Sequence, residues 1–256
     1  MSFSEYFYER LRNRGFIAVL GVFLAACAVS ATYWTLSFDL RNLLMSIIYM
    51  LFVPLTLLVE WKTGIRLGTL LAAAVFFMAF GSILGSAFDF YTIIPFFDTL
   101  LHGMAGLLFA ALGFSVAECF FRNGDERSAR HFLGCLAFAI CFSLAIAVLW
   151  ELIEYAGTVF CGFDMMEDTY INEINSYLLA GSHNETVLLE GITKTVIYYG
   201  DGQLYEIVGS YLDIGLLDTL TDMSICTFGA VVFGMLALIG RKCSKLREML
   251  IPRLKR

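Results

Sequence analysis

The chain has 256 residues, of which 59% are hydrophobic and only 16% are charged, and its formal net charge at pH 7 is −6. Soluble domains are typically about 45–50% apolar and about 25% charged. This composition therefore excludes an ordinary soluble enzyme, a nucleic-acid-binding protein and a disordered chain. The 24 phenylalanines and 12 tyrosines suit helices that meet lipid and the membrane interface. We predict an all-α polytopic membrane protein with membrane lipid as its first partner.

Six apolar stretches are each about 20 residues long, which is the length of an α-helix that crosses a bilayer. They lie near residues 15–37, 42–60, 67–89, 98–120, 132–157 and 216–240. In the third stretch, Gly81 and Gly85 form a small-xxx-small pattern, which lets helix backbones approach closely. The sequence thus predicts a single integral membrane domain over residues 1–256, built as a six-helix bundle.

The basic residues predict the orientation of these spans, because cytoplasmic loops of membrane proteins are enriched in Lys and Arg. Only Arg41 and Lys194 of the 17 basic residues fall on one side of the predicted alternation. The others fall on the opposite side: Arg10, Arg12, Arg14, Lys62, Arg66, Arg122, Arg127, Arg130, Arg241, Lys242, Lys245, Arg247, Arg253, Lys255 and Arg256. We therefore expect a protein of the inner (plasma) membrane with both termini in the cytoplasm.

The first span also resembles a targeting segment. Leu24-Ala25-Ala26-Cys27 matches a bacterial lipobox, and the arginines before it could form a basic signal region. Cleavage there would delete the first span and disturb the alternation of spans and basic loops. We therefore favour an uncleaved anchor helix and leave open whether Cys27 is lipidated.

Residues 158–215 form the single long connection between predicted spans, and we expect this loop on the extracytoplasmic side. It is acidic, with Asp164, Glu167, Asp168, Glu173, Glu185, Glu190, Asp201, Glu206 and Asp213. Two β-prone runs, 194–199 and 203–208, flank Gly200-Asp201-Gly202 and predict a β-hairpin. Loops of this length usually have a function of their own, but the sequence leaves the role of this one open.

Ionisable residues occur in pairs at three predicted helix ends. The pairs are Asp98 with His102, Glu151 with Glu154, and Asp218 with Asp222. Residues three or four positions apart share one face of a helix, and all three ends lie in the predicted extracytoplasmic half. We therefore expect the six side chains to converge in one pocket.

Simpler roles are open for some of these residues. Asp98 and Asp218 could each cap a helix N-terminus, and Glu151 with Glu154 could face water at the interface. Asp222 and His102 are harder to explain in this way. An ionisable group well inside a membrane span costs about 2.5 kcal/mol or more near the span's centre.

The balance of charge in the predicted pocket points to a bound ion. The chain has no Lys or Arg in residues 67–121, 132–193 or 195–240, whereas like charges about 4 Å apart repel by about 4 kcal/mol at an effective dielectric near 20. Three readings are open: a divalent metal neutralises the carboxylates, some carboxylates hold a proton, or the pairs do not converge. We favour the metal, with all six residues as ligands, since carboxylates with one imidazole suit Mg²⁺, Mn²⁺, Zn²⁺ or Fe²⁺.

Three motifs around these pairs are similar to those of a known family. They are Phe97-Asp98-x-x-x-His102, Leu149-Trp150-Glu151-x-x-Glu154-Tyr155 and Asp218-Thr219-x-x-Asp222-Met223. Their order and spacing resemble the YjdF-like family of uncharacterised bacterial inner-membrane proteins. The resemblance covers the third to sixth spans, and it implies the membrane fold and the same six polar positions. It implies no particular reaction, and the region around residues 163–210 is longer here than is typical of the family.

The leading functional prediction is a metal-dependent hydrolase or transferase acting on a lipid or envelope substrate, with His102 or Glu154 as the general base. A cation- or proton-coupled transporter is the second reading, although only Glu60 and Glu118 continue a polar path toward the cytoplasmic side. A non-catalytic membrane scaffold is the third. The sequence does not name the substrate, the metal, the oligomeric state or whether the protein is an enzyme.

Overall fold

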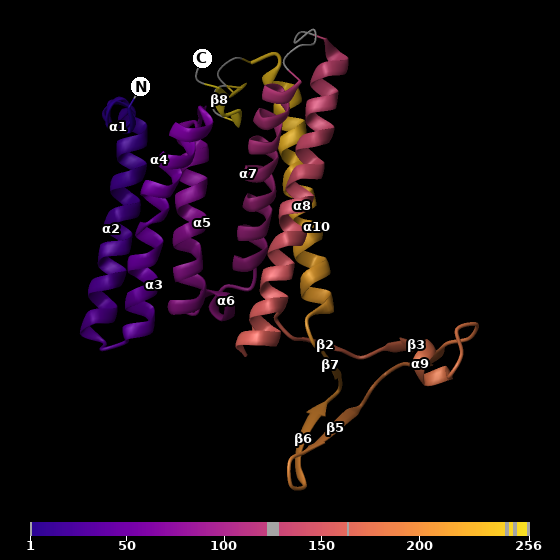
Figure 1. Cartoon of the computed structure of the whole chain (residues 1–256). Coiled ribbons are helices and arrows are strands. Elements are labelled where there is room, and N and C mark those ends of the chain that lie inside the picture. The colour runs from indigo at the N-terminus through magenta and orange to yellow at the C-terminus, as the bar shows by residue number, and fades with distance from the viewer. Residues whose placement is uncertain (1, 122–127, 163, 244–245, 248–249, 255–256) are drawn as a thin grey trace. The chain divides into compact units, whose positions relative to one another are not determined.

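The computed structural model of the chain describes residues 2–121, 128–162, 164–243, 246–247 and 250–254. Within these residues six helices are long and apolar enough to cross a membrane (Figure 1). They are Arg14–Leu36 (α2), Leu40–Thr63 (α3 with α4), Thr69–Ala87 (α5), Phe97–Phe120 (α7), Ala129–Cys161 (α8) and Leu216–Gly240 (α10). The predicted fold class, a six-span helical membrane protein, is therefore confirmed. Of the basic residues used to predict orientation, Arg122, Arg127, Lys245, Lys255 and Arg256 lie outside the described residues.

The second span consists of two consecutive helices, α3 (Leu40–Met50) and α4 (Phe52–Thr63). The residue between them is Leu51, and Pro54 follows in the first turn of α4. Proline has no backbone N–H, so it cannot donate the bond to Met50 that a continuous helix would make, but it is tolerated in a first turn. The sequence pattern showed one apolar stretch here, and this proline accounts for its division.

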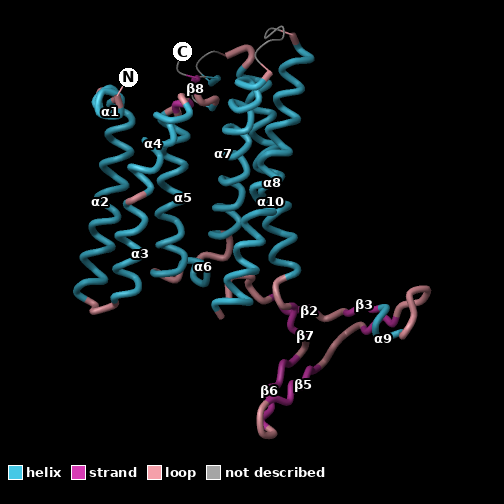
Figure 2. The backbone as a smooth tube through the Cα atoms, in the orientation of Figure 1, coloured by secondary structure: helices cyan, strands magenta, loops and turns pink. Residues whose placement is uncertain are grey.

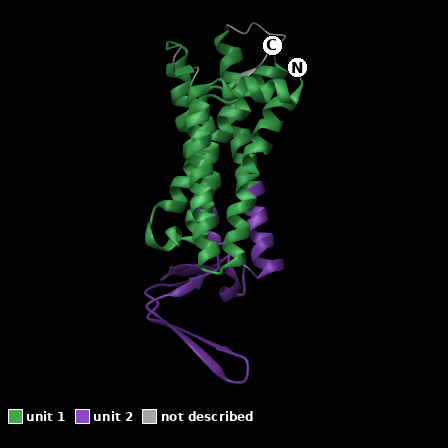
Figure 3. Cartoon of the chain, turned by 90° about the vertical axis from the view of Figure 1, so that its left-hand side faces the viewer, with its two compact units in different colours: residues 1–148, 222–256 green, residues 149–221 purple. Residues whose placement is uncertain are grey.

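The chain divides into two compact units, residues 1–148 with 222–256 and residues 149–221 (Figure 3). Helices α8 and α10 each contribute residues to both units. The prediction of a single membrane domain over the whole chain stays a prediction, and the two units are described separately below.

The first unit has a hydrophobic core in which α2 packs on α3 and α5, and α5 packs on α7. Phe23 of α2 stacks on Phe76 of α5 with ring centroids 4.9 Å apart. Cys27, also on α2, is completely buried in the same core. The short α6 (Phe90–Ile93) links α5 to α7.

The close packing expected from the small residues of the third span is present. A Cβ atom on Gly81 would press on the Leu101 side chain of α7, and one on Gly85 would overlap the Tyr91 ring of α6. Both positions therefore require glycine, because neighbouring side chains occupy the space where a Cβ would be.

The two chain ends of the first unit are also packed against it. The N-terminal α1 (Phe3–Leu11) begins with a capping box, in which Ser2 and Glu5 each accept the other's backbone N–H. Near the C-terminus, β8 (Arg253–Leu254) pairs antiparallel with β1 (Ile65–Arg66). Leu250 and Ile251 are buried just before β8.

The second unit contains the remaining described strands (Figure 2). In it β2 (Thr169–Ile171) pairs with β7 (Tyr211–Asp213), and β3 (Ile174–Ser176) pairs with β4 (Val187–Leu189), next to the short α9 (Tyr177–Ala180). The strands β5 (Lys194–Tyr199) and β6 (Gln203–Val208) form the predicted β-hairpin, with Tyr199 opposite Gln203. Its turn contains Gly200 and Gly202 at φ values of 55° and 87°, which glycine adopts without steric cost.

Candidate functional site

The first unit brings together three of the predicted site residues, Asp98, His102 and Asp222. Nε2 of His102 lies 3.5 Å from Oδ1 of Asp98 and 3.3 Å from Oδ2 of Asp222. One ligand atom from each residue lies within 4.8 Å of the other two, which is close enough for a single metal ion to contact all three. We call these three residues the acidic–histidine cluster.

Asp98 and His102 come from one helix, and Asp222 comes from another that crosses it closely. Asp98 lies in the first turn of α7, and His102 follows four residues later on the same face. At the crossing, a Cβ on Gly106 of α7 would overlap the carbonyl oxygen of Cys226 of α10. A Cβ on Gly229 would overlap the carbonyl oxygen of Gly103 in the same way. The absence of side chains at these two glycines lets the backbones touch, and this contact places Asp222 opposite His102.

A hydrogen bond from a third helix supports this crossing. Ser143 of α8 donates its hydroxyl to the carbonyl oxygen of Gly106 at 2.9 Å and is itself buried. Serine side chains of this kind link helices within membranes, where small residues allow close approach. The backbone of α7 one turn beyond His102 therefore contacts both α8 and α10.

The three side chains of the acidic–histidine cluster differ in their exposure to solvent. The side chain of Asp98 is 32% exposed, that of His102 is 12% exposed and that of Asp222 is 6% exposed. Asp98 is thus the outer residue, and Asp222 is the innermost.

Cys226 is a fourth member of this site that the sequence analysis did not identify. Its thiol donates to the carbonyl oxygen of His102 at 3.2 Å, and its sulfur lies 3.8 Å from Nδ1 of the same residue. Cys226 is buried and follows Asp222 by four positions on α10. That spacing is visible in the sequence, but spacing within one helix does not show that Cys226 meets His102 of another helix.

The other three predicted site residues, Glu151, Glu154 and Asp218, belong to the second unit. Glu154 accepts a hydrogen bond of 2.8 Å from the indole N–H of Trp150, one turn earlier on α8. Asp218 accepts the backbone N–H of Glu167 at 3.1 Å, so this carboxylate holds the loop to the start of α10. That all six residues form one pocket stays a prediction.

A second buried ionic cluster lies at the other end of α5 in the first unit. Arg10 of α1 and Glu60 of α4 form a two-pronged ion pair with distances of 3.0 and 3.1 Å, and their side chains are 1% and 2% exposed. Tyr6 donates to Glu60 at 2.7 Å, and the backbone N–H of Leu67 donates to it at 2.8 Å. We call these residues the arginine–glutamate cluster.

The environment of the arginine–glutamate cluster shifts the pKa values of its two α1 residues. Burial, followed by the hydrogen bond and the charge of Glu60, raises the pKa of the Tyr6 hydroxyl well above its ordinary value. Burial lowers the pKa of the Arg10 guanidinium, although Glu60 opposes that shift. Arg10 also donates to the carbonyl oxygen of Leu67 at 2.9 Å and lies over the Phe16 ring at 3.9 Å. Each charge therefore has partners within the protein.

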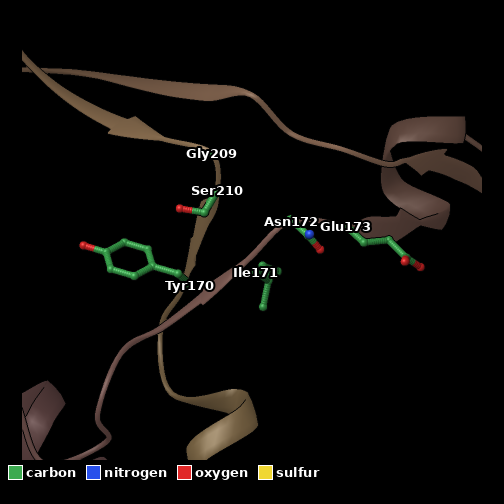
Figure 4. Close-up of a pocket in the computed structure, with 6 residues that line it drawn as sticks. All are labelled: Tyr170, Ile171, Asn172, Glu173, Gly209 and Ser210. Carbon is green, nitrogen blue, oxygen red and sulfur yellow. The ribbon is translucent and has the colours of Figure 1, made fainter.

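The second unit has an open hollow between β2 and β7 and the neighbouring turn (Figure 4). It is lined by Tyr170, Ile171, Asn172, Glu173, Gly209 and Ser210. The hydroxyls of Tyr170 and Ser210 point to one side, while the Glu173 carboxylate points to the other (Figure 4). Because these polar groups do not converge, we assign no chemistry to this hollow.

The fold and the site define a class of protein: a multi-pass helical membrane protein with carboxylates and a histidine inside its spans. The family described as "Predicted membrane protein (DUF2238)" matches residues 15–242, and the chain belongs to this family. No curated protein and no solved structure matches the chain.

Proposed function

We propose that the acidic–histidine cluster binds a divalent metal ion and uses it for hydrolysis or group transfer on a lipid or envelope substrate. The observation that carries the proposal is the approach of two carboxylates to one imidazole nitrogen, at 3.5 and 3.3 Å, inside membrane-spanning helices. Charged groups in such spans are costly unless something compensates them.

The protein supplies little positive charge near these positions in the sequence. No Lys or Arg occurs in residues 67–121 or 195–240, the segments that contain α7 and the whole of α10. A divalent cation would compensate both carboxylates at once. The oxygen and imidazole donors suit Mg²⁺, Mn²⁺, Zn²⁺ or Fe²⁺.

The three residues would have distinct tasks. Asp222, the most buried, would anchor the ion, Asp98 would bind it at the open side, and His102 would supply the nitrogen ligand. A bound ion would polarise a phosphoryl or carbonyl oxygen of the substrate or lower the pKa of a bound water. If His102 is a ligand through Nε2, the general base must be another residue, and Glu154 remains the candidate for that role.

Three finer features belong to this proposal. We propose that Glu151, Glu154 and Asp218 join the metal ligands, as the pairing of acidic residues in the sequence suggests. We propose a location in the inner membrane with both termini in the cytoplasm and residues 158–215 outside it, on the distribution of basic residues. Kinship with the YjdF-like proteins is proposed on the three motifs that contain these six positions.

The arginine–glutamate cluster makes a transport function less attractive than metal chemistry. A proton or cation relay needs titratable groups that can exchange their charge along a path. Glu60, one of the two acids considered for a polar path toward the cytoplasmic side, is already bound by Arg10, Tyr6 and Leu67. Glu118, the other, lies 3.4 Å from Arg247.

A thermal-shift series in detergent tests the proposal. An ion that binds only the folded state stabilises it by about 2.7 kcal/mol at one hundred times its dissociation constant. We expect the midpoint of the wild-type protein to rise with at least one of Mg²⁺, Mn²⁺, Zn²⁺ and Fe²⁺ and to fall again with chelator.

Two aspartate-to-asparagine variants make the comparison specific. Asp222→Asn should lose most of the metal-dependent shift, whereas Asp201→Asn, in the exposed hairpin turn of the second unit, should keep it. Equal midpoints with and without every ion would overturn the metal function and favour carboxylates that hold protons.

A further inference from the structure

Cys226 makes two contacts with His102, one with its backbone carbonyl oxygen and one with its imidazole ring. A thiol has one hydrogen to donate, and the 3.2 Å contact directs it to the carbonyl oxygen of His102. The sulfur lone pairs are then the groups that lie 3.8 Å from Nδ1. With a hydrogen on Nδ1, the ring N–H donates to the sulfur while the thiol donates to the carbonyl oxygen, so both contacts are hydrogen bonds at once.

This arrangement leaves Nε2 without a hydrogen in the neutral imidazole. Nε2 is the nitrogen that faces Asp98 and Asp222. A lone pair that points at two carboxylates is electrostatically unfavourable, and a cation placed between the three groups would make it favourable. The geometry around Nδ1 thus prepares Nε2 as a metal ligand.

We propose that Cys226 is a positioning residue that holds the proton on Nδ1 of His102 and so directs the Nε2 lone pair toward the cation. This inference rests on the metal function proposed above. Cys226 itself does not bind the ion, because its sulfur lies on the Nδ1 side of the imidazole ring. Hydrogen bonds of this kind to a histidine ligand fix the ring and its tautomer, and their loss typically lowers metal affinity about 10–100-fold.

The close crossing of α7 and α10 makes Cys226 suited to this task. Its backbone carbonyl occupies the space where Gly106 would otherwise have a Cβ, so its main chain cannot shift without separating the helices. The side chain of Cys226 is buried. The sulfur is therefore held at a defined place relative to His102.

The tautomer is measured directly by ¹⁵N NMR of histidine-labelled protein in detergent. The chain has three histidines, and replacing His131 and His183 with Gln leaves only the His102 signals. In metal-free protein, at a pH where the ¹⁵N spectrum itself reports a neutral ring, we expect the hydrogen on Nδ1. Cys226→Ala should shift the hydrogen toward Nε2, and Cys226→Ser should restore Nδ1, because a hydroxyl also donates and accepts. A hydrogen on Nε2 in the wild type would overturn the proposal.

Zn²⁺ titration supplies the second readout. Cys226→Ala should weaken binding about 10–100-fold, and Cys226→Ser should bind nearly as well as the wild type. Cys135→Ala is the matched control, because Cys135 is also buried and its sulfur lies 3.5 Å from another histidine, His131. Cys135→Ala should change neither affinity nor tautomer.

The outcomes separate this inference from the metal function. If the wild type binds no metal but the tautomer depends on Cys226, the metal function fails and the orienting role stands. If Zn²⁺ binds the wild type and Cys226→Ala equally, the positioning role fails and the metal function stands. A thiolate-to-metal charge-transfer band with Co²⁺ that disappears in Cys226→Ser would make Cys226 a ligand and overturn the inference.

Discussion

The first unit contains two buried groups of ionisable residues, one at each end of α5. They differ in the partners that their carboxylates meet. In the arginine–glutamate cluster, Glu60 meets a guanidinium, a tyrosine hydroxyl and a backbone N–H. In the acidic–histidine cluster, Asp98 and Asp222 both approach the same imidazole nitrogen. The first cluster is neutral by its own composition, whereas the second has two acids and one weak base.

This difference separates a structural element from a candidate site. A buried ion pair with satisfied hydrogen bonds holds α1 and α4 together and needs nothing from outside the protein. The acidic–histidine cluster places two carboxylates against one imidazole nitrogen and has a partly exposed outer residue, which is why we propose a cation there. Removal of one acid should therefore have opposite consequences in the two clusters.

The largest expected effect is at the arginine–glutamate cluster. Glu60→Gln leaves the Arg10 guanidinium buried without its counter-charge, and breaking a buried pair in this way costs about 3–5 kcal/mol. Chemical or thermal unfolding in detergent measures the loss. Arg66→Ala, which removes the partly exposed contact with Glu9 at 2.9 Å, should cost only about 0–1 kcal/mol. Similar losses in both variants would contradict the structural role of the buried pair.

The next effect concerns the helix crossing that builds the acidic–histidine cluster. Gly106→Ala places a methyl group where the Cys226 carbonyl oxygen lies, and overpacking of this kind typically costs about 1–3 kcal/mol. The metal-dependent thermal shift should decrease as well, since His102 and Asp222 move apart. Gly134→Ala is the control, because nothing lies within 4 Å of its added Cβ. If Gly134→Ala destabilised the protein equally, the crossing would not be the cause.

A pH-dependent effect is expected from Tyr6. Tyr6→Phe removes a hydrogen bond to the charged Glu60, and the loss should lower the free energy of unfolding by about 1.5–3 kcal/mol. The raised pKa of Tyr6 means that the folded state keeps the phenolic proton while the unfolded chain loses it near pH 10. This contribution is therefore complete below about pH 10 and is lost as the pH rises toward the folded pKa.

Stability measurements from pH 8 to pH 11 test this contribution. The wild type should lose stability above pH 10 more steeply than Tyr6→Phe, and Tyr8→Phe, whose side chain is largely exposed, should follow the wild type. Parallel curves for the wild type and Tyr6→Phe would show that Tyr6 is not the titrating group.

The smallest expected effect has the opposite sign. In the presence of chelator, Asp222→Asn should be as stable as the wild type or slightly more stable. The amide removes a negative charge beside Asp98 and can donate an N–H to Nε2 of His102, 3.3 Å from the present carboxylate oxygen. Unfolding with chelator present measures this. A loss comparable to that of Glu60→Gln would mean that the acidic–histidine cluster is already complete without a cation.

Much of the fold follows from local patterns in the sequence. The six spans follow from apolar length, because a bilayer demands about 20 apolar residues per helix. The hairpin of β5 and β6 follows from two β-prone runs around Gly200-Asp201-Gly202. The pairing of Asp98 with His102 follows from their spacing of four, because helix geometry alone brings such residues together.

Other features were decided only by contacts between distant parts of the chain. The sequence placed Glu60 on a possible polar path toward the cytoplasmic side, yet it pairs with Arg10, 50 residues earlier. Cys226 lies within an apolar stretch of the sequence, yet its sulfur meets a histidine 124 residues away. No local period predicts such partners, because they depend on which helices cross and where.

The acidic–histidine cluster shows both kinds of information in one place. The sequence by itself determined that Asp98 and His102 share a face and that Asp222 lies one turn into the last span. Only the tertiary structure decided that α7 and α10 touch at Gly106 and Gly229. Each glycine lies on a different helix, so no pattern within one helix predicts that they meet. The reason is physical: periodicity describes one helix, whereas the approach of two backbones depends on the shapes of both.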